Sequence, residues 1–154
     1  MKSLLGLLDR ELTFWDLEAE TDEEVIGFLA DKLIRKGIAK ESFKSAVIER
    51  ERTAPTGLKT ERIGVAMPHT TEEHVNRKGL AVGFLKSPVR FRAMGMPEEE
   101  VETRIVFLPA LTDPHGHIDF LRELASAFEH SDILVTMAEA RDFDRLTASI
   151  RAMA

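Results

Sequence analysis

The chain has 154 residues, of which 44% are hydrophobic and 31% charged, a mixture typical of a globular protein. This length suits one sizeable core, and we expect residues 1–154 to form a single domain. The absence of cysteine excludes a disulfide scaffold and any cysteine-ligated metal, and the formal net charge of -6 argues against a nucleic-acid binder.

The first third of the chain predicts a short strand followed by two helices. Residues 12–17 form a short apolar segment that we expect to be an edge strand. Thr21 and Glu24 have the spacing of a capping box, so a helix begins there and continues until a glycine ends it. A second helix is expected over about 41–50, because the Ala-Pro-Thr-Gly stretch at 54–57 cannot continue a helix.

The middle of the chain contains apolar segments with the length of strands. Their residues are 63–67, 80–85 and 103–108. Between the last two, the stretch at 87–97 contains two prolines and a glycine, and it predicts a loop or bulge.

The last third predicts helices. In the segment 117–128 an apolar stripe recurs at helical spacing, formed by Ile118, Leu121, Leu124, Ala125 and Phe128. Residues 133–137 fit a strand and a helix equally well, and residues 143–150 are amphipathic. Helices, then strands, then helices predict an α/β fold, with helices packed on a small sheet.

Among the five histidines, His69 has the most distinctive context. It follows an apolar strand and Pro68 in the sequence Val-Ala-Met-Pro-His-Thr at 65–70, and reacting groups in α/β sheets gather beyond the carboxyl ends of strands. A neutral imidazole is a nucleophile, although the spacing alone is equally compatible with a solvated loop histidine. His74 and His130 lie among glutamates, and we expect both to be solvated.

A second cluster, Asp113-Pro-His-Gly-His117, precedes the helix of the last third. The amino terminus of a helix favours an anion, and His117 there can donate a hydrogen bond to a phosphoryl oxygen. Alternatively, His115 and His117 form a metal site with Asp113 or His69. The spacing alone favours a third interpretation, in which these are surface histidines.

Arg50 closes the second predicted helix, where a cation complements the helix dipole. Its planar guanidinium group also suits a phosphoryl group. The glycine-rich phosphate loop, the dinucleotide-binding glycine motif and the motifs of zinc peptidases and serine hydrolases are all absent from the sequence.

Three motifs, in this order, resemble the IIA component of the sugar phosphotransferase system. They are Arg-Glu-Arg-Thr-Ala-Pro-Thr-Gly-Leu at 50–58, Gly-Val-Ala-Met-Pro-His-Thr at 64–70 and His-Ile-Asp-Phe-Leu-Arg-Glu-Leu at 117–124. The resemblance is to the fructose/mannitol type, and the Pro-Thr-Gly-Leu run is most similar to the galactitol-type subgroup. It covers nearly the whole chain, with Met67 at a position where isoleucine or valine is commoner.

The resemblance assigns roles to four residues. His69 corresponds to the phosphorylated histidine, His117 to a second histidine that faces it, and Arg50 to the arginine beside the site. Thr56 corresponds, by a weaker match, to a hydroxyl in the pocket. The resemblance also implies a mixed sheet with helices on both faces and a helix at 133–137, with no cofactor and no metal ion.

The implied activity is that of a cytoplasmic phosphotransferase. His69 would accept a phosphoryl group from the histidine phosphocarrier protein and pass it to a cysteine of a IIB component. That component would serve a membrane IIC transporter of a sugar or sugar alcohol similar to galactitol, without insertion of this chain into the membrane and without nucleic acid. The alternatives are a regulatory carrier whose phosphorylation state controls other proteins, a metal-dependent hydrolase, and a binding module without chemistry.

Two successive partners must reach the same histidine, so we expect a shallow, open and partly apolar surface around it, with small contacts. Methionine adapts to different partners, and Met67, Met94 and Met96 are candidates for this surface. The position of Met67 on a strand favours the core for that residue.

Overall fold

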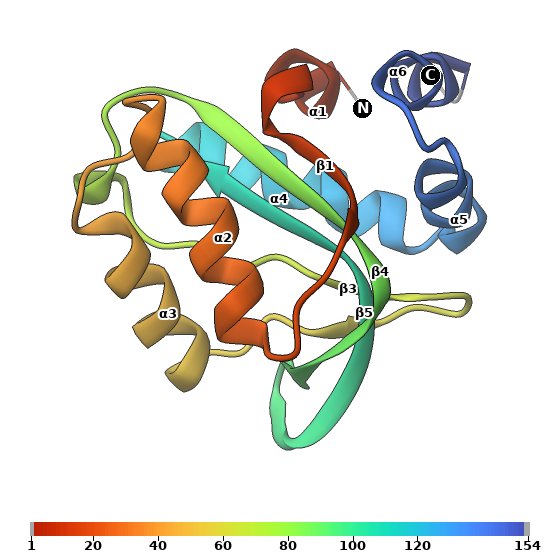
Figure 1. Ribbon diagram of the computed structural model, residues 1–154, viewed down its shortest axis with the longest axis horizontal. Coiled ribbons are helices and arrows are strands. Elements are labelled where there is room, and N and C mark those ends of the chain that lie inside the picture. The colour runs from red at the N-terminus through yellow and green to blue at the C-terminus, as the bar shows by residue number, and fades with distance from the viewer. Residues whose placement is uncertain (1, 153–154) are drawn as a thin grey trace.

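A computed structural model describes residues 2–152, which form a mixed β-sheet with helices on both faces (Figure 1). The strands are β1 (Thr13–Leu17), β2 (Leu58–Lys59), β3 (Gly64–Ala66), β4 (Gly79–Ala93) and β5 (Met96–Ala110). Their order in the sheet is β1-β4-β5-β3-β2, so β1 is an edge strand as predicted. β1 runs parallel to β4 and β3 runs parallel to β5, whereas the other neighbours are antiparallel.

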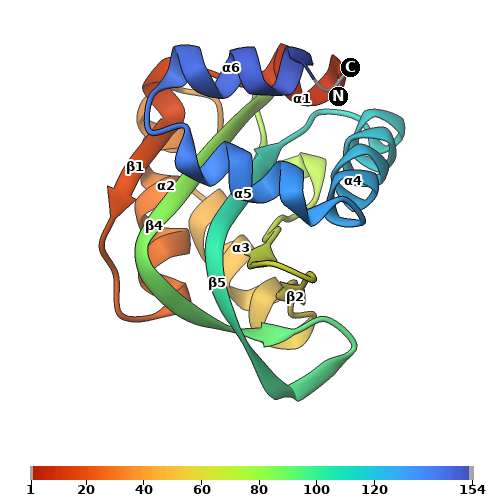
Figure 2. The same ribbon diagram turned by 90° about the vertical axis from the view of Figure 1, so that its right-hand side faces the viewer.

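The helices divide between the two faces of the sheet. They are α1 (Lys2–Leu7), α2 (Asp22–Arg35), α3 (Phe43–Thr53), α4 (Pro114–Phe128), α5 (Ser131–Glu139) and α6 (Phe143–Ala152), with short 3-10 turns η1 (Arg10–Leu12) and η2 (Glu72–His74). α2 and α3 cover one face, and the other four helices cover the opposite face (Figures 1 and 2). The predicted α/β fold is confirmed, and residues 133–137 are helical. Within the part of the chain described here, none of the helices has the length and apolar character to cross a membrane.

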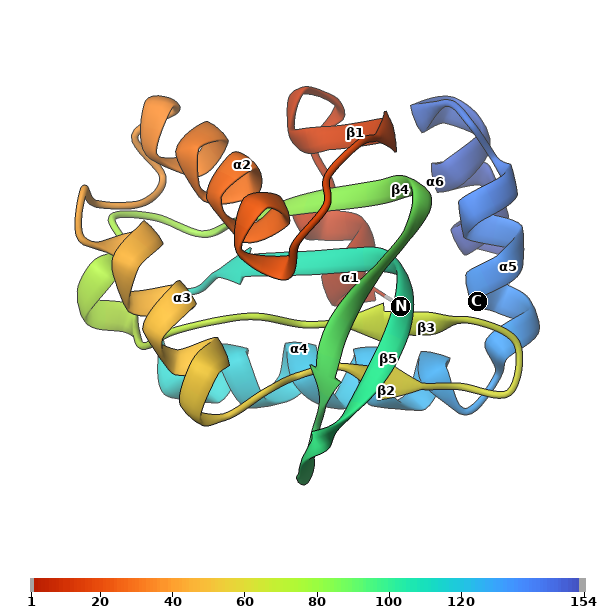
Figure 3. The ribbon, with the colours of Figure 1, turned by 60° about the horizontal axis from the view of Figure 1, so that its bottom comes forward.

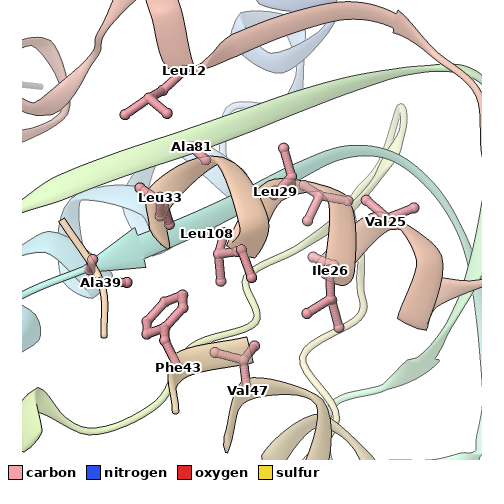
Figure 4. Close-up of a cluster of buried hydrophobic side chains, with 14 of the residues drawn as sticks. Leu12, Val25, Ile26, Leu29, Leu33, Ala39, Phe43, Val47, Ala81 and Leu108 are labelled. Atoms are coloured by element: carbon pink, nitrogen blue, oxygen red, sulfur yellow. The ribbon is translucent and has the colours of Figure 1, made fainter. Parts of the chain in front are cut away.

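Each face of the sheet has its own apolar core. Under α2 and α3 the fully buried side chains include Ile26, Leu29, Leu33, Phe43 and Val47, which pack against β4 and β5 (Figure 4). On the other face the buried side chains include Phe107, Phe120, Leu124, Leu134 and Ile150. Burial of each such side chain contributes about 1.5–3 kcal/mol, so both layers of helices are held to the sheet by the hydrophobic effect.

The start of α2 follows the predicted capping pattern only in part. The Thr21 hydroxyl accepts a hydrogen bond from the Glu24 backbone N–H at 3.2 Å, which caps the helix. The Glu24 carboxylate, however, accepts from the backbone N–H of Glu20 at 2.9 Å and not from that of Thr21. The return hydrogen bond of the predicted capping box is therefore wrong: Glu24 binds the backbone N–H one residue before Thr21. The helix nevertheless begins where the sequence predicts.

The stretch at 87–97 is part of a hairpin, which corrects the predicted loop. β4 and β5 continue through it to a turn at Gly95, whose positive φ of 78° suits glycine. Val89 and Phe91 point to the core while the arginines between and after them are exposed, so the alternation of a strand is present. The register of the two strands shifts between Phe84 and Val89 and again between Arg92 and Ala93, in line with the bulge that was the alternative prediction.

The helix α4 begins three residues earlier than predicted and is rotated relative to the predicted stripe. Its buried residues are Phe120, Leu124, Ala127 and Phe128. Ile118 is 48% exposed and Ala125 is also exposed, so their predicted burial is wrong. The two phenylalanines supply more apolar area than Ile118, and the helix turns them toward the sheet. This rotation leaves Ile118 at the surface, close to the segment that follows β3.

The segment that leaves β3 passes between α3 and α4 (Figure 3). It carries Met67, Pro68 and His69, and the first two side chains are buried. The carboxyl end of β3, the last turns of α3 and the first turns of α4 therefore meet at one place, where the candidate site lies.

Candidate active site

His69 is held by its own backbone. Its Nδ1 atom lies 2.8 Å from the carbonyl oxygen of Met67, two residues earlier. A carbonyl oxygen only accepts hydrogen bonds, so Nδ1 carries the hydrogen and Nε2 of the neutral ring keeps its lone pair. The structure thus identifies the carbonyl that holds the ring and the ring nitrogen that is free.

The ring of His117 faces the ring of His69. Their centroids are 5.0 Å apart and the rings are inclined by 66°. His117 is the fourth residue of α4, and its backbone N–H donates to the carbonyl of Asp113 at 3.1 Å. The first turn of α4 thus brings together two histidines that are far apart in the sequence.

An open pocket of about 280 Å³ lies in front of both rings. Its walls are formed by Arg50 of α3, the segment His69, Thr70, Thr71 and Glu72, and Pro114, His117, Ile118 and Leu121 of α4. Arg50 therefore lines the same pocket as His69 and His117, in line with the sequence motifs. Glu72, Ile118 and Leu121 were not predicted as site residues, and the spacing of the sequence offers no signal that places them here.

The pocket favours the neutral form of both histidines. Burial lowers the pKa of His69 below its ordinary value of 6.5, whereas the hydrogen bond to Met67 raises it. The charge of Arg50, and that of His117 when it is protonated, lower it further. Burial and the charge of Arg50 also lower the pKa of His117, against the opposite effect of Glu72. His69 therefore keeps the unprotonated Nε2 that a nucleophile needs.

Thr56 is buried and does not line the pocket. The residue is only 4% exposed. Its hydroxyl donates to the Glu51 carboxylate at 2.9 Å and accepts from the backbone N–H of Met67 at 3.0 Å. The structure therefore does not bring this hydroxyl into the pocket, where the resemblance placed it. Glu51 was not predicted as a site residue, although it continues the buried stripe of Phe43 and Val47 at intervals of four residues.

In the cluster at the start of α4, Asp113 has a structural function. The Asp113 carboxylate accepts from the backbone N–H of Gly116, which caps the helix, and this hydrogen bond lowers the pKa of Asp113. His115 is exposed and does not line the pocket. Among residues 2–152 no group of three or more histidine, aspartate or glutamate side chains is arranged to hold a metal ion.

The remaining candidates lie elsewhere. His74 was expected to be solvated, but its side chain is only 24% exposed, and its Nδ1 forms a 2.8 Å hydrogen bond with Ser42. His130 is exposed, as expected. Met67 is 7% exposed and belongs to the core, which confirms the favoured interpretation. Met94 and Met96 are exposed at the hairpin turn and do not line the pocket of His69.

The sequence matches the family described as "Phosphoenolpyruvate-dependent sugar phosphotransferase system, EIIA 2" over residues 6–153. The chain belongs to this family. It is a IIA component of the mannitol/galactitol type, in a family of phosphotransferases. Its mixed five-stranded sheet matches the fold of solved mannitol IIA structures.

Two relatives and one solved structure illustrate the similarity. The mannitol-specific EIICBA component of Pasteurella multocida is 26% identical over 149 residues, which are 95% of this chain and 23% of that protein. The galactitol-specific EIIA component of Escherichia coli K12 is 26% identical over 116 residues, 74% of this chain and 75% of that protein. A complex of enzyme IIAMTL and phosphorylated enzyme IIBMTL from Escherichia coli has the same fold, with a TM-score of 0.77, 23% identity and coverage of 94% of this chain and 97% of that chain. The chain spans about a quarter of the length of the mannitol-specific EIICBA component.

Proposed function

We propose that this IIA component carries a phosphoryl group on Nε2 of His69. The observation that carries the proposal is the hydrogen bond from Nδ1 to the Met67 carbonyl, which leaves Nε2 as the nitrogen with a free lone pair. The open pocket beside His117 and Arg50 gives a phosphoryl group room to arrive and to leave.

In the first transfer, the Nε2 lone pair forms a bond to phosphorus while the bond between phosphorus and the imidazole of the histidine phosphocarrier protein breaks. The electron pair of that bond remains with the leaving imidazole. In the second transfer, the cysteine sulfur of a IIB component bonds to phosphorus, and the electron pair of the P–N bond returns to Nε2. Such transfers depend on in-line positioning and charge stabilisation, because the chemistry needs little covalent help.

Three side chains of the pocket determine how strongly it holds the transferred group. Arg50 supplies a permanent positive charge, and the ring of His117 lies against that of His69 and is a donor for a phosphoryl oxygen. Glu72 in the wall limits the positive potential. Moderate stabilisation suits a carrier, because a tightly held phosphoryl group would slow the second transfer.

The rim of the pocket offers an apolar contact for the two partners. Ile118 is 48% exposed, and Pro114 and Leu121 lie beside it in the pocket wall. A small apolar surface of this kind suits transient complexes, which bury less than about 1,200 Å². The complex of enzyme IIAMTL with phosphorylated IIBMTL supports a IIB component as the acceptor.

The relatives named for mannitol and galactitol support a sugar alcohol as the transported solute, and the Pro-Thr-Gly-Leu run at 55–58 favours the galactitol type. Transfer from the phosphorylated chain to purified IIB components of the galactitol and mannitol types measures this preference. Faster transfer to the galactitol-type IIB is expected, and equal or slower transfer would contradict it. The regulatory role stays a prediction that this transfer assay also addresses, since a purely regulatory carrier would serve neither IIB.

The decisive experiment is intact-mass analysis after incubation with phosphoenolpyruvate, enzyme I and the histidine phosphocarrier protein. Wild type should gain one acid-labile phosphoryl group, and His69→Ala should gain none. His115→Ala is the matched control, because this exposed histidine does not line the pocket. No gain in wild type with cognate carrier proteins, or an equal gain in His69→Ala, would refute the proposal.

A further inference from the structure

The carboxyl group of Glu51 takes no part in the proposed transfer, yet it is buried beside the site. Glu51 follows Arg50 in α3 and is only 5% exposed. Removing a carboxylate from water costs free energy that only well-placed donors offset. A buried titratable group next to a cleft is therefore a candidate for a function beyond packing.

Both oxygens of the Glu51 carboxylate accept hydrogen bonds from one residue, Thr56. Oε2 accepts from the backbone N–H at 2.8 Å, and Oε1 accepts from the hydroxyl at 2.9 Å. The Thr56 oxygen in turn accepts from the backbone N–H of Met67 at 3.0 Å, and the carbonyl of Met67 accepts from Nδ1 of His69 at 2.8 Å. A continuous series of hydrogen bonds thus connects α3 to the ring of His69.

The direction of this series depends on Glu51. A threonine hydroxyl has a single hydrogen, and the backbone N–H of Met67 can only donate to it. The hydroxyl hydrogen must therefore go to an acceptor, and Glu51 provides that acceptor in a buried place where water does not compete. Met67 is consequently fixed on both sides, its N–H by Thr56 and its carbonyl by His69.

We propose that Glu51 is a positioning residue for His69, which acts through Thr56 to hold the Met67 carbonyl where it keeps the hydrogen on Nδ1 and leaves Nε2 free. The inference rests on the proposed function of His69. The same carboxylate ties the end of α3 to this segment, so it also fixes Arg50 relative to His69. Consecutive helical residues project about 100° apart, which allows Arg50 to face the pocket while Glu51 faces the interior.

Four variants separate positioning from simple packing. Thr56→Val removes the hydroxyl at nearly constant volume, Thr56→Ser keeps it, and Glu51→Gln leaves one oxygen acceptor for the two Thr56 donors. Thr103→Val is the matched control, because Thr103 is fully buried in β5 and its hydroxyl donates at 3.1 Å to the Val101 carbonyl, outside the series. Each variant is examined for thermal stability, for the ¹⁵N chemical shifts of the His69 ring above its titration range, and for the initial rate of phosphorylation.

In wild type and Thr56→Ser, the ¹⁵N shifts should report a single tautomer with hydrogen on Nδ1. In Thr56→Val and Glu51→Gln, they should move toward a mixture of both tautomers, and the rate should fall about 10- to 100-fold. Thr103→Val should lose stability while keeping the shifts and the rate of wild type. Wild-type shifts and rates in both Glu51→Gln and Thr56→Val would overturn the proposal and leave Glu51 a purely structural residue.

The tautomer measurement does not depend on phosphorylation. A wild-type protein that is never phosphorylated would refute the proposed function, while the shifts would still decide whether Glu51 sets the tautomer. If Thr56→Val does not fold, a comparison of Glu51→Gln with Thr56→Ser still tests the proposal. Both of these variants retain a hydroxyl at position 56, so a difference between them is due to Glu51.

Discussion

The two walls of the pocket are built in different ways. On the β3 side, Glu51 and Thr56 are buried, and hydrogen bonds link them through Met67 to His69. On the α4 side, the Asp113 cap is partly exposed, and within residues 2–152 the ring of His117 has no hydrogen bond and contacts His69 edge-on.

This difference matches the demands of a carrier. The nucleophile needs one tautomer and one orientation at every transfer, and buried hydrogen bonds are rigid enough to supply them. The opposite wall must adjust to a phosphoryl group that arrives with one partner and departs with another. A histidine without a fixed partner, on a helix with an exposed apolar rim, can make that adjustment.

The largest expected effect concerns the buried wall. Burial raises the pKa of Glu51 to about 7, despite the hydrogen bonds from Thr56 that lower it, with Asp22 contributing to the rise. A pKa raised above the unfolded value of 4.5 means that the folded protein binds this proton more tightly. This stabilisation is complete below pH 4.5 and is lost as the pH rises to about 7, a change of about 3 kcal/mol.

Urea unfolding of wild type and Glu51→Gln across this pH range measures the effect. Glutamine does not titrate, so the difference in the free energy of unfolding isolates Glu51 from the other titratable groups. Wild type should lose stability relative to the variant as the pH rises. If the difference in the free energy of unfolding is constant across the range, Glu51 ionises with an ordinary pKa. Water would then reach its carboxyl group more readily than the structure indicates.

On the opposite wall, His117→Ala should slow phosphorylation of His69 by about 100-fold, because one preorganised donor for the transferred group is removed. The stability of the fold should change little, since His117 is only half-buried. His115→Ala, two residues earlier and exposed, is the control and should keep the wild-type rate. Equal rates in both variants would mean that the donor wall contributes nothing to the transfer.

The cap of α4 offers a smaller test of the same wall. Asp113→Ala removes the acceptor for the Gly116 N–H and should lower the free energy of unfolding. Asp113→Asn keeps the capping oxygen and should retain most of the stability, which urea unfolding measures. If the two variants lose the same stability, the loss comes from the charge beside Lys78 and not from the cap.

Much of this site can be predicted from the sequence because its groups lie at the ends of regular elements. The apolar run before Pro68 places His69 beyond a strand, and the turn at 54–57 places Arg50 at the end of a helix. The resemblance connects both to His117. These positions depend on local patterns and on the order of motifs, which the sequence contains.

The residues that escaped prediction depend on contacts between distant segments. In the sequence, Glu51 is one of several charged residues at the end of a helix. Only its interval of four residues from Val47 indicates that it faces inward. The rotation of α4 that exposes Ile118 follows from how Phe120 and Phe128 fit the sheet, which helical periodicity cannot resolve for a helix with apolar residues on several sides. The hairpin at 87–97 was missed because Pro88 and Gly95 interrupt its alternation.

The smallest expected effect concerns the charge that both walls share. Arg50 lies in the pocket and lowers the pKa of both His69 and His117, in each case less than burial does. Arg50→Gln should therefore raise both pKa values toward the ordinary 6.5 without reaching it. Arg52→Gln is the matched control: this exposed arginine pairs with Glu23 at 2.5 Å and does not line the pocket.

Titration of the histidine ring protons by NMR measures both values in each variant. A rise in the pKa of both histidines in Arg50→Gln, with no rise in Arg52→Gln, would show that the β3 side and the α4 side of the pocket experience the same charge. A rise in His117 alone would show that the buried wall is screened from Arg50. In that case burial and the Met67 hydrogen bond would set the protonation of His69, and Arg50 would act only on the incoming phosphoryl group.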